Sequence, residues 1–119
     1  ESPEAAVDAA RALAARPGGT VAVSGPVDLI VDAGRTARVH GGSVLLTRVT
    51  GGGCALGAAM AALLAVADGF TAATTASAIW AVASERAEAA STGPGSFAVA
   101  FLDALAAVEP ADLDGRVTV

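Results

Sequence analysis

Val49 to Ala59 reads VTGGGCALGAA, a stretch in which three glycines separate an extended segment from a long alanine-rich run. Alanine is the strongest helix former, so the run predicts a helix over residues 54–67. A glycine-rich turn before a helix presents free backbone N–H groups at the positive end of the helix dipole. The stretch therefore predicts an anion site at Gly52, Gly53 and Cys54. The alternative is an ordinary strand–turn–helix junction with a buried cysteine.

The glycine pattern excludes two common nucleotide-binding motifs. A P-loop requires a lysine after its glycines, and none follows here. The dinucleotide pattern G-x-G-x-x-G fits Gly51 and Gly53, but its third glycine comes one position late, at Gly57. What remains is an anion site with a cysteine at the start of the helix. Because a helix N-terminus favours a thiolate, Cys54 is a candidate base or polar anchor.

The composition narrows the class of protein. The 119 residues suffice for one domain, and 54% are hydrophobic, although many of these are alanine. A net charge of −5 without a basic patch argues against a nucleic-acid binder. The single cysteine excludes an internal disulfide, and the chain begins without a targeting signal. Its longest apolar run, residues 54–67, is too short to span a membrane. We expect a soluble cytoplasmic protein.

Hydrophobic periodicity and turn residues predict a three-layer α/β arrangement. Ser2 to Glu4 begins a helix that ends at Arg16 and Pro17, and Thr20–Ser24 is a strand of the kind buried in a parallel sheet. The turn at Ala33 and Gly34 predicts a hairpin. The remaining expected elements are the hairpin strands 28–32 and 36–40, a further extended segment at 44–47, helices over 54–67, 72–90 and 97–108, and an edge strand at 116–119.

Several polar or aromatic residues are interpreted as structural. His40 has no second histidine or cysteine for a metal site, and Trp80 lies at helical spacing among small residues, as a core residue or subunit contact does. Ser96 is interpreted as a helix cap. Asp28 and Asp32 are interpreted as turn formers rather than magnesium ligands. Glu85, Arg86 and Glu88 are interpreted as a solvated helix face with local pairing.

Four motifs follow one another in a familiar order. They are VAVSGPVD at residues 21–28, HGGSVLLTRV at 40–49, GGGCAL at 51–56, and GPGSF at 93–97 with FLDAL at 101–105. This succession closely resembles the C-terminal half of the hydroxyethylthiazole kinases, a ribokinase-like family of thiamine salvage. The resemblance covers nearly the whole chain. It implies that residues 1–119 are the C-terminal half of one ribokinase-like three-layer α/β/α kinase domain.

The resemblance also implies an activity and roles for individual residues. The reaction is transfer of the ATP γ-phosphoryl group to the hydroxyl of 4-methyl-5-(2-hydroxyethyl)thiazole, with Mg²⁺. Ser24 is then a nucleotide-binding residue, Gly51 lies against the thiazole, and Cys54 occupies the position of the general base in related kinases. The family further suggests a homotrimer with active sites between subunits.

Two departures from the family bear on these expectations. Gly52 stands where the family has a threonine, which removes a side-chain donor beside the anion site. Complete members are also considerably longer, and their N-terminal half carries the rest of the thiazole pocket, the acidic magnesium ligands and much of the ATP site. The isolated chain is therefore expected to bind ATP weakly and to be inactive. Two other functions remain open: a hydroxymethylpyrimidine-type or other small-alcohol kinase, and a noncatalytic nucleotide-binding module.

Overall fold

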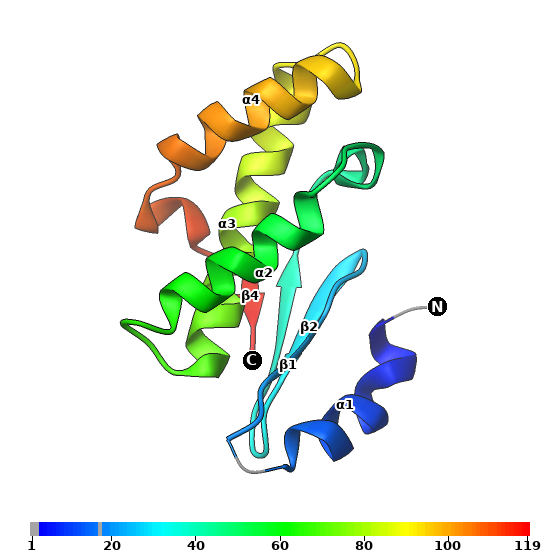
Figure 1. Ribbon diagram of the computed structural model, residues 1–119, viewed down its shortest axis with the longest axis vertical. Helices are drawn as coiled ribbons and strands as arrows, with labels where there is room; N and C mark the ends of the chain where they lie inside the picture. The colour runs from blue at the N-terminus through cyan, green and yellow to red at the C-terminus, as the bar shows by residue number, and fades with distance from the viewer. Residues whose placement is uncertain (1–2, 17) are drawn as a thin grey trace.

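The computed structural model describes residues 3–16 and 18–119, which form a four-stranded sheet with helices on both faces (Figure 1). The strands are β1 (Val21–Val23), β2 (Val27–Val31), β3 (Thr36–His40) and β4 (Val117–Thr118). The α-helices are α1 (Val7–Ala14), α2 (Gly52–Leu63), α3 (Gly69–Ala89) and α4 (Pro94–Ala107). The described residues also form three 3₁₀ helices: η1 (Pro3–Ala6), η2 (Val44–Arg48) and η3 (Pro110–Leu113).

The sheet has the order β1-β2-β3-β4, and every neighbouring pair is antiparallel. The expectation of a parallel sheet around Thr20–Ser24 is therefore wrong. Only residues 24–26 connect β1 to β2, and a parallel pair would need a long crossover connection. The hairpin between β2 and β3 is confirmed, and β4 pairs with β3 as the expected strand at 116–119.

The two faces of the sheet bury alternate residues against different helices. Leu29 and Val31 pack with Ala10 and Ala14 of α1. On the other face, Ile30, Ala37 and Val39 pack against α3 residues that include Phe70 and Ala81. The layers are thus α1, the sheet and α3. This arrangement confirms the three-layer α/β/α expectation.

α3 is the central helix of the chain. Its other side packs against α2 and α4 around Trp80, Phe97 and Phe101 (Figure 1). Twelve of its 21 residues are buried, most of them alanine or serine, because only small side chains fit between two layers. Asp68 begins the helix by accepting a hydrogen bond from the Thr71 N–H at 2.7 Å. Because α3 lies between the sheet on one side and α2 and α4 on the other, its side chains can hold loops on both sides.

Three local expectations were wrong. The segment 44–47 is the 3₁₀ helix η2 rather than a strand, because Ser43 Oγ accepts a hydrogen bond from the Leu45 N–H at 3.1 Å and starts a helical turn. Ser96 is not the cap of α4, which begins after Gly93. It lies within the first turn and accepts from the Thr92 N–H. The helix at 54–67 begins two residues earlier, at Gly52, and ends at Leu63. Ser2, where the first helix was expected to begin, lies outside the described residues.

His40 and the lengths of the helices bear on two further expectations. His40 lies at the end of β3, and its Nε2 is 3.1 Å from Thr118 Oγ1 of β4, in accord with a structural role. Among the described helices, none has the length and apolar character needed to cross a membrane.

Candidate functional site

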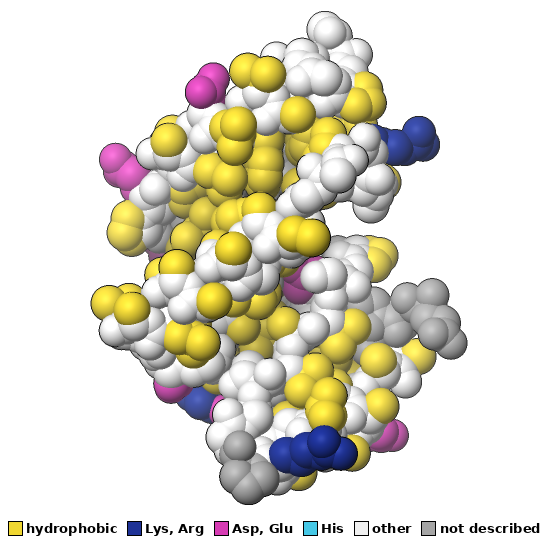
Figure 2. All heavy atoms as spheres, viewed as in Figure 1, with side chains coloured by type: hydrophobic (Ala, Val, Ile, Leu, Met, Phe, Trp, Pro, Cys, Tyr) yellow, Lys and Arg dark blue, Asp and Glu magenta, His cyan; other side chains and the backbone are white. Residues whose placement is uncertain are grey.

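A cavity of about 600 Å³ lies where three loops meet beside α3. The β1–β2 turn contributes Ser24, the loop after β3 contributes Gly42, and the first turn of α2 contributes Gly52 and Gly53. Trp80 of α3 lines the cavity as well. Figure 2 shows the molecule hollowed on the side where η2 faces the β1–β2 turn. The structure therefore brings the predicted nucleotide residue Ser24 to the same cavity as two of the predicted anion-site glycines.

The first turn of α2 leaves backbone N–H groups without partners inside the helix. Gly51 has φ +90°, a left-handed conformation that favours glycine, and it turns the chain into the helix. The first helical hydrogen bond runs from the Ala55 N–H to the Gly51 carbonyl oxygen at 2.8 Å. The N–H groups of Gly52, Gly53 and Cys54 consequently have no partner within the helix.

Trp80 ties this first turn to α3. Its indole N–H donates to the Gly52 carbonyl oxygen at 3.1 Å, and its ring meets Phe101 edge-on with centroids 5.7 Å apart. The expectation of Trp80 as a core residue is confirmed, since its exposed fraction is 8%. Its hydrogen bond to the glycine turn was not anticipated. A periodic pattern of small residues carries no signal for such a long-range contact.

Two predicted site residues lie beside the cavity rather than in its wall. Gly51 and Cys54 are both exposed, and neither lines the cavity, although both adjoin the lining residues Gly52 and Gly53 along the chain. Cys54 is a free cysteine, so the alternative expectation of a buried cysteine is wrong. Packing among the described residues therefore does not explain a cysteine at this position.

Asp28 is a lining residue that was interpreted only as a turn former. It does hold the turn, because its Oδ1 accepts a hydrogen bond from the Gly25 N–H at 2.9 Å. Burial raises the pKa of the Asp28 carboxyl, and the Gly25 N–H and the nearby Ser77 hydroxyl partly offset that effect. Asp28 thus places one partly desolvated carboxylate in the cavity wall.

Two side chains of α3 hold the loop after β3 in place. Ser84 Oγ accepts from the Ser43 N–H at 3.0 Å, and Glu85 Oε1 accepts from the Gly42 N–H at 2.9 Å. Arg116 donates to both Glu85 oxygens at 2.7 Å, and these bonds lower the pKa of the Glu85 carboxyl. The expectation of a solvated face with local pairing is therefore wrong for Glu85.

The neighbouring residue Arg86 also pairs at long range. Its Nη2 lies 2.7 Å from Oδ1 of Asp112 in η3. Both ion pairs join α3 to the C-terminal segment, which lies far away in sequence. Because only the tertiary fold brings these charges together, the i, i+3 and i, i+4 spacing within the helix could not reveal them.

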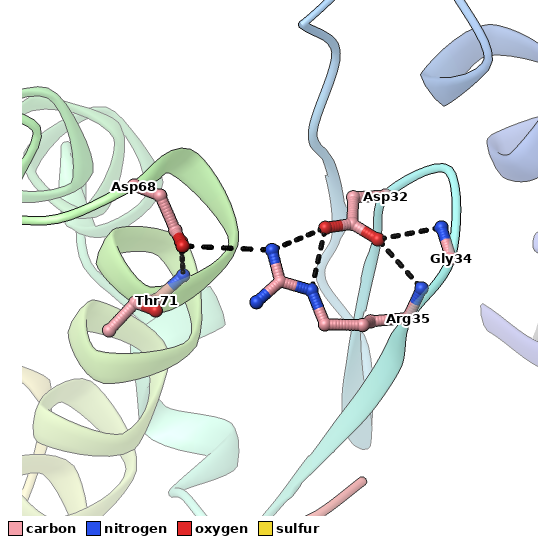
Figure 3. Close-up of polar contacts among 5 residues, drawn as sticks. All are labelled: Asp32, Gly34, Arg35, Asp68 and Thr71. Carbon is pink, nitrogen blue, oxygen red and sulfur yellow. Dashed lines mark hydrogen bonds and ion pairs between the residues drawn. The ribbon is translucent and has the colours of Figure 1, made fainter.

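A second hollow, of about 470 Å³, lies at the other end of β2 and β3. Three of its charged groups are paired: Arg35 donates to Asp32 Oδ2 at 2.6 and 2.8 Å and lies 3.7 Å from Asp68 Oδ2 (Figure 3). The Arg35 guanidinium also lies 4.3 Å from the centre of the Phe70 ring. Asp32 accepts from the Gly34 and Arg35 N–H groups, as a turn former does. These contacts join the hairpin to the start of α3 and have a structural role.

The chain itself offers little to hold a metal ion. Across residues 3–16 and 18–119, no group of three or more histidine, cysteine, aspartate or glutamate side chains is placed to bind one. Asp28 supplies a single carboxylate at the cavity. Hard cations such as Mg²⁺ need several oxygen ligands. The residues present do not form a magnesium site, so we assign no step to the metal here.

Comparison with known proteins gives a consistent result. The sequence profile of the hydroxyethylthiazole kinase family matches residues 1–111. The chain is 57% identical to a hydroxyethylthiazole kinase of Kineococcus radiotolerans over 107 residues, which cover 89% of this chain and 39% of the relative. It is 53% identical to a hydroxyethylthiazole kinase of Clavibacter sepedonicus, over 90% of this chain and 39% of the relative.

A solved structure agrees with these relatives. The structure of a hydroxyethylthiazole kinase protein from Pyrococcus horikoshii OT3 superposes with a TM-score of 0.90 at 35% sequence identity. The match covers 98% of this chain and 46% of that chain. The chain thus spans less than half the length of the proteins it matches.

Proposed function

Because this chain belongs to the hydroxyethylthiazole kinase family, we propose that it is the C-terminal portion of a kinase domain with that activity. The enzyme transfers the γ-phosphoryl group of ATP to the primary hydroxyl of 4-methyl-5-(2-hydroxyethyl)thiazole. The observation that carries the proposal is the cavity that joins Ser24 to the N-terminal turn of α2. Phosphoryl transfer depends on positioning and on stabilisation of charge, and both can come from such a cavity.

The N-terminal turn of α2 supplies charge stabilisation in this proposal. The N–H groups of Gly52, Gly53 and Cys54 would donate to oxygens of the transferred phosphoryl group, since they have no partner within the helix. Ser24 would contact the nucleotide from the β1–β2 turn, across the same cavity. Gly51 would lie against the thiazole, where the absence of a side chain leaves room for the ring.

Cys54 would accept the proton of the substrate hydroxyl. Its thiol is exposed beside the cavity and is therefore free to meet a substrate held by other parts of the enzyme. In a loose transition state the hydroxyl loses its proton late, so a modest base suffices. This role requires that the substrate bind on the outer side of the α2 turn, next to Gly51.

Other features of the whole enzyme extend beyond this chain. We propose that Mg²⁺ accompanies ATP, that its acidic ligands belong to the rest of the enzyme, and that the enzyme is cytoplasmic. We also propose a homotrimer. Exposed apolar side chains on the outer helices support a subunit contact: Leu64 and Val66 follow α2, and Val99 and Leu102 lie on α4. Sedimentation of the purified full-length enzyme would test the trimer.

The test of function is a substrate panel with the full-length enzyme. We expect ATP-dependent phosphorylation of hydroxyethylthiazole in preference to hydroxymethylpyrimidine. Preference for the pyrimidine would favour the related kinase activity, whereas ATP binding without turnover of any alcohol would indicate a noncatalytic nucleotide-binding protein. Ser24→Ala should raise KM for ATP more than KM for the thiazole, because the hydroxyl is assigned to the nucleotide.

A further inference from the structure

The loop that borders the cavity after β3 has a conformation that favours glycine at two successive positions. Gly41 and Gly42 have φ +96° and +106°, in the left-handed region that disfavours other residues. A Cβ atom at Gly41 would also collide with Arg116 Nη1 and Glu85 Oε1. Glycine is therefore required here both by the backbone angle and by the close approach of an ion pair.

Two successive side chains of α3 bind two successive N–H groups of this loop. Glu85 accepts from Gly42, and Ser84, which is fully buried, accepts from Ser43. Ser43 in turn starts η2 through its bond to the Leu45 N–H, and η2 leads into the glycine turn of α2. The position of the loop thus affects two walls of the cavity.

Asp28 already lines the cavity with a carboxylate, and a second negative charge beside it at Glu85 would add to the repulsion of an anion. Arg116 removes this difficulty. Its guanidinium binds both oxygens of Glu85, each at 2.7 Å, and a bidentate pair fixes the carboxylate as well as neutralising it. Arg116 comes immediately before β4, so the edge strand of the sheet delivers the neutralising charge.

We propose that Glu85, held and neutralised by Arg116, is a positioning residue for the phosphate cavity and acts through the Gly41–Ser43 loop. The inference rests on the proposed function for the identity of the ligand. Its structural part, that Glu85 orders the loop, does not. Neither residue is assigned to the chemical step.

The experiment compares four single variants and one double variant, Arg116→Gln with Glu85→Gln, of the full-length enzyme. Glu85→Ala removes the acceptor and the charge, and Glu85→Gln keeps an oxygen that can accept from Gly42. Arg116→Gln leaves the Glu85 charge without its neutralising partner. Arg86→Ala is the matched control. Arg86 lies next to Glu85 on α3, and its ion pair with Asp112 of η3 makes no contact with the loop. The measurements are amide hydrogen exchange over residues 41–47, KM for ATP, kcat and thermal stability.

We expect Glu85→Ala to speed exchange in the loop and to raise KM for ATP by about fivefold, the effect of one lost hydrogen bond. Glu85→Gln should stay within about twofold of the wild type. Arg116→Gln should raise KM, and adding Glu85→Gln to it should restore affinity, because the repelling charge is then gone. Arg86→Ala should lower stability and leave exchange and KM unchanged.

Two results would overturn the proposal. One is a Glu85→Ala variant that loses stability while its loop exchange and KM match those of the wild type. The other is an equal rise in KM for Arg86→Ala, which would show a general effect of losing an ion pair. If the wild-type enzyme fails to phosphorylate the thiazole, the proposed function fails, and loop exchange in Glu85→Ala still decides whether Glu85 positions the loop.

Discussion

The indole N–H of Trp80 donates a hydrogen bond to the carbonyl oxygen of Gly52 at 3.1 Å, and this bond fixes the first turn of α2 against α3. The two residues are 28 positions apart in sequence. The contact matters because the N–H groups of this turn can stabilise an anion only if the turn keeps its orientation.

Trp80→Phe tests this contact, because it removes the N–H donor and retains an aromatic ring against Phe101. We expect the free energy of unfolding to fall by about 1 kcal/mol, the usual value of one hydrogen bond. Affinity for ATP should fall with it if the turn loses its orientation. Urea unfolding and ATP titration of the full-length enzyme give both quantities. An unchanged affinity would assign Trp80 to packing alone.

Gly51 and Gly52 form a matched pair for the second prediction. A Cβ at Gly51 would meet no atom within 4 Å, so the cost of Gly51→Ala comes from its φ of +90° alone. We expect a loss of about 1–2 kcal/mol in unfolding free energy. Gly52→Ala should instead be neutral or stabilise by about 0.5–1 kcal/mol, because its Cβ would only touch Leu46 at ordinary van der Waals distance. Chemical denaturation distinguishes the two, and equal losses would contradict the role of the backbone angle.

Local sequence signals predicted those parts of the fold that local chemistry determines. The turn at Ala33 and Gly34, the α-helices and the glycine turn before α2 were all expected, because each depends on residues that are neighbours in the chain. The strand at 44–47 was wrong because a single serine hydroxyl outweighed an apolar pattern. The direction of β1 was wrong because apolar composition does not distinguish parallel from antiparallel pairing.

Only those residues of the candidate site that belong to sequence motifs could be predicted. The resemblance assigned Ser24 to the nucleotide, and the glycines predicted an anion site at the turn before α2. In the structure Ser24, Gly52 and Gly53 line one cavity. The supporting contacts of Trp80, Glu85 and Arg116 could not be predicted, because each depends on how α3 packs between two layers. From sequence alone, a charged residue on a helix is interpreted as solvent-exposed, because its distant partner in the chain is unknown.

Asp28 supplies a prediction on pH dependence. Burial raises the pKa of its carboxyl above the ordinary value of 3.8, so ionisation costs stability as the pH rises through the folded-state pKa. Asp28→Asn cannot ionise and can still accept from the Gly25 N–H. We expect the variant to be more stable than the wild type at about pH 7, and the difference to shrink toward about pH 4. Unfolding by urea across this range measures it, and a wild type that is the more stable at neutral pH would contradict the desolvation argument.

Asp32 should behave in the opposite way. The Arg35 side chain and the Gly34 N–H lower the pKa of its carboxyl, so its contribution is present above pH 3.8 and is lost as the pH falls through the folded-state value (Figure 3). Asp32→Asn should therefore be less stable than the wild type at neutral pH. The difference should decrease below pH 3.8 and also at high salt, which screens the exposed pair. A difference that persists unchanged in acid would assign the effect to hydrogen-bond geometry instead of charge.

Cys54 gives the last prediction, which separates a chemical role from a structural one. The side chain is exposed beside the cavity, so Cys54→Val should leave stability nearly unchanged, as most exposed substitutions do. If the thiol accepts the substrate proton, this variant should lose kcat, while KM for ATP stays close to that of the wild type because the anion donors are backbone N–H groups. Cys54→Asp should retain substantial activity, since a carboxylate can accept the same proton. Thermal unfolding of each variant confirms that differences in kcat do not reflect misfolding. A valine variant that turns over like the wild type would remove Cys54 from the chemistry and leave the phosphoryl group held by the α2 turn without a base from this chain.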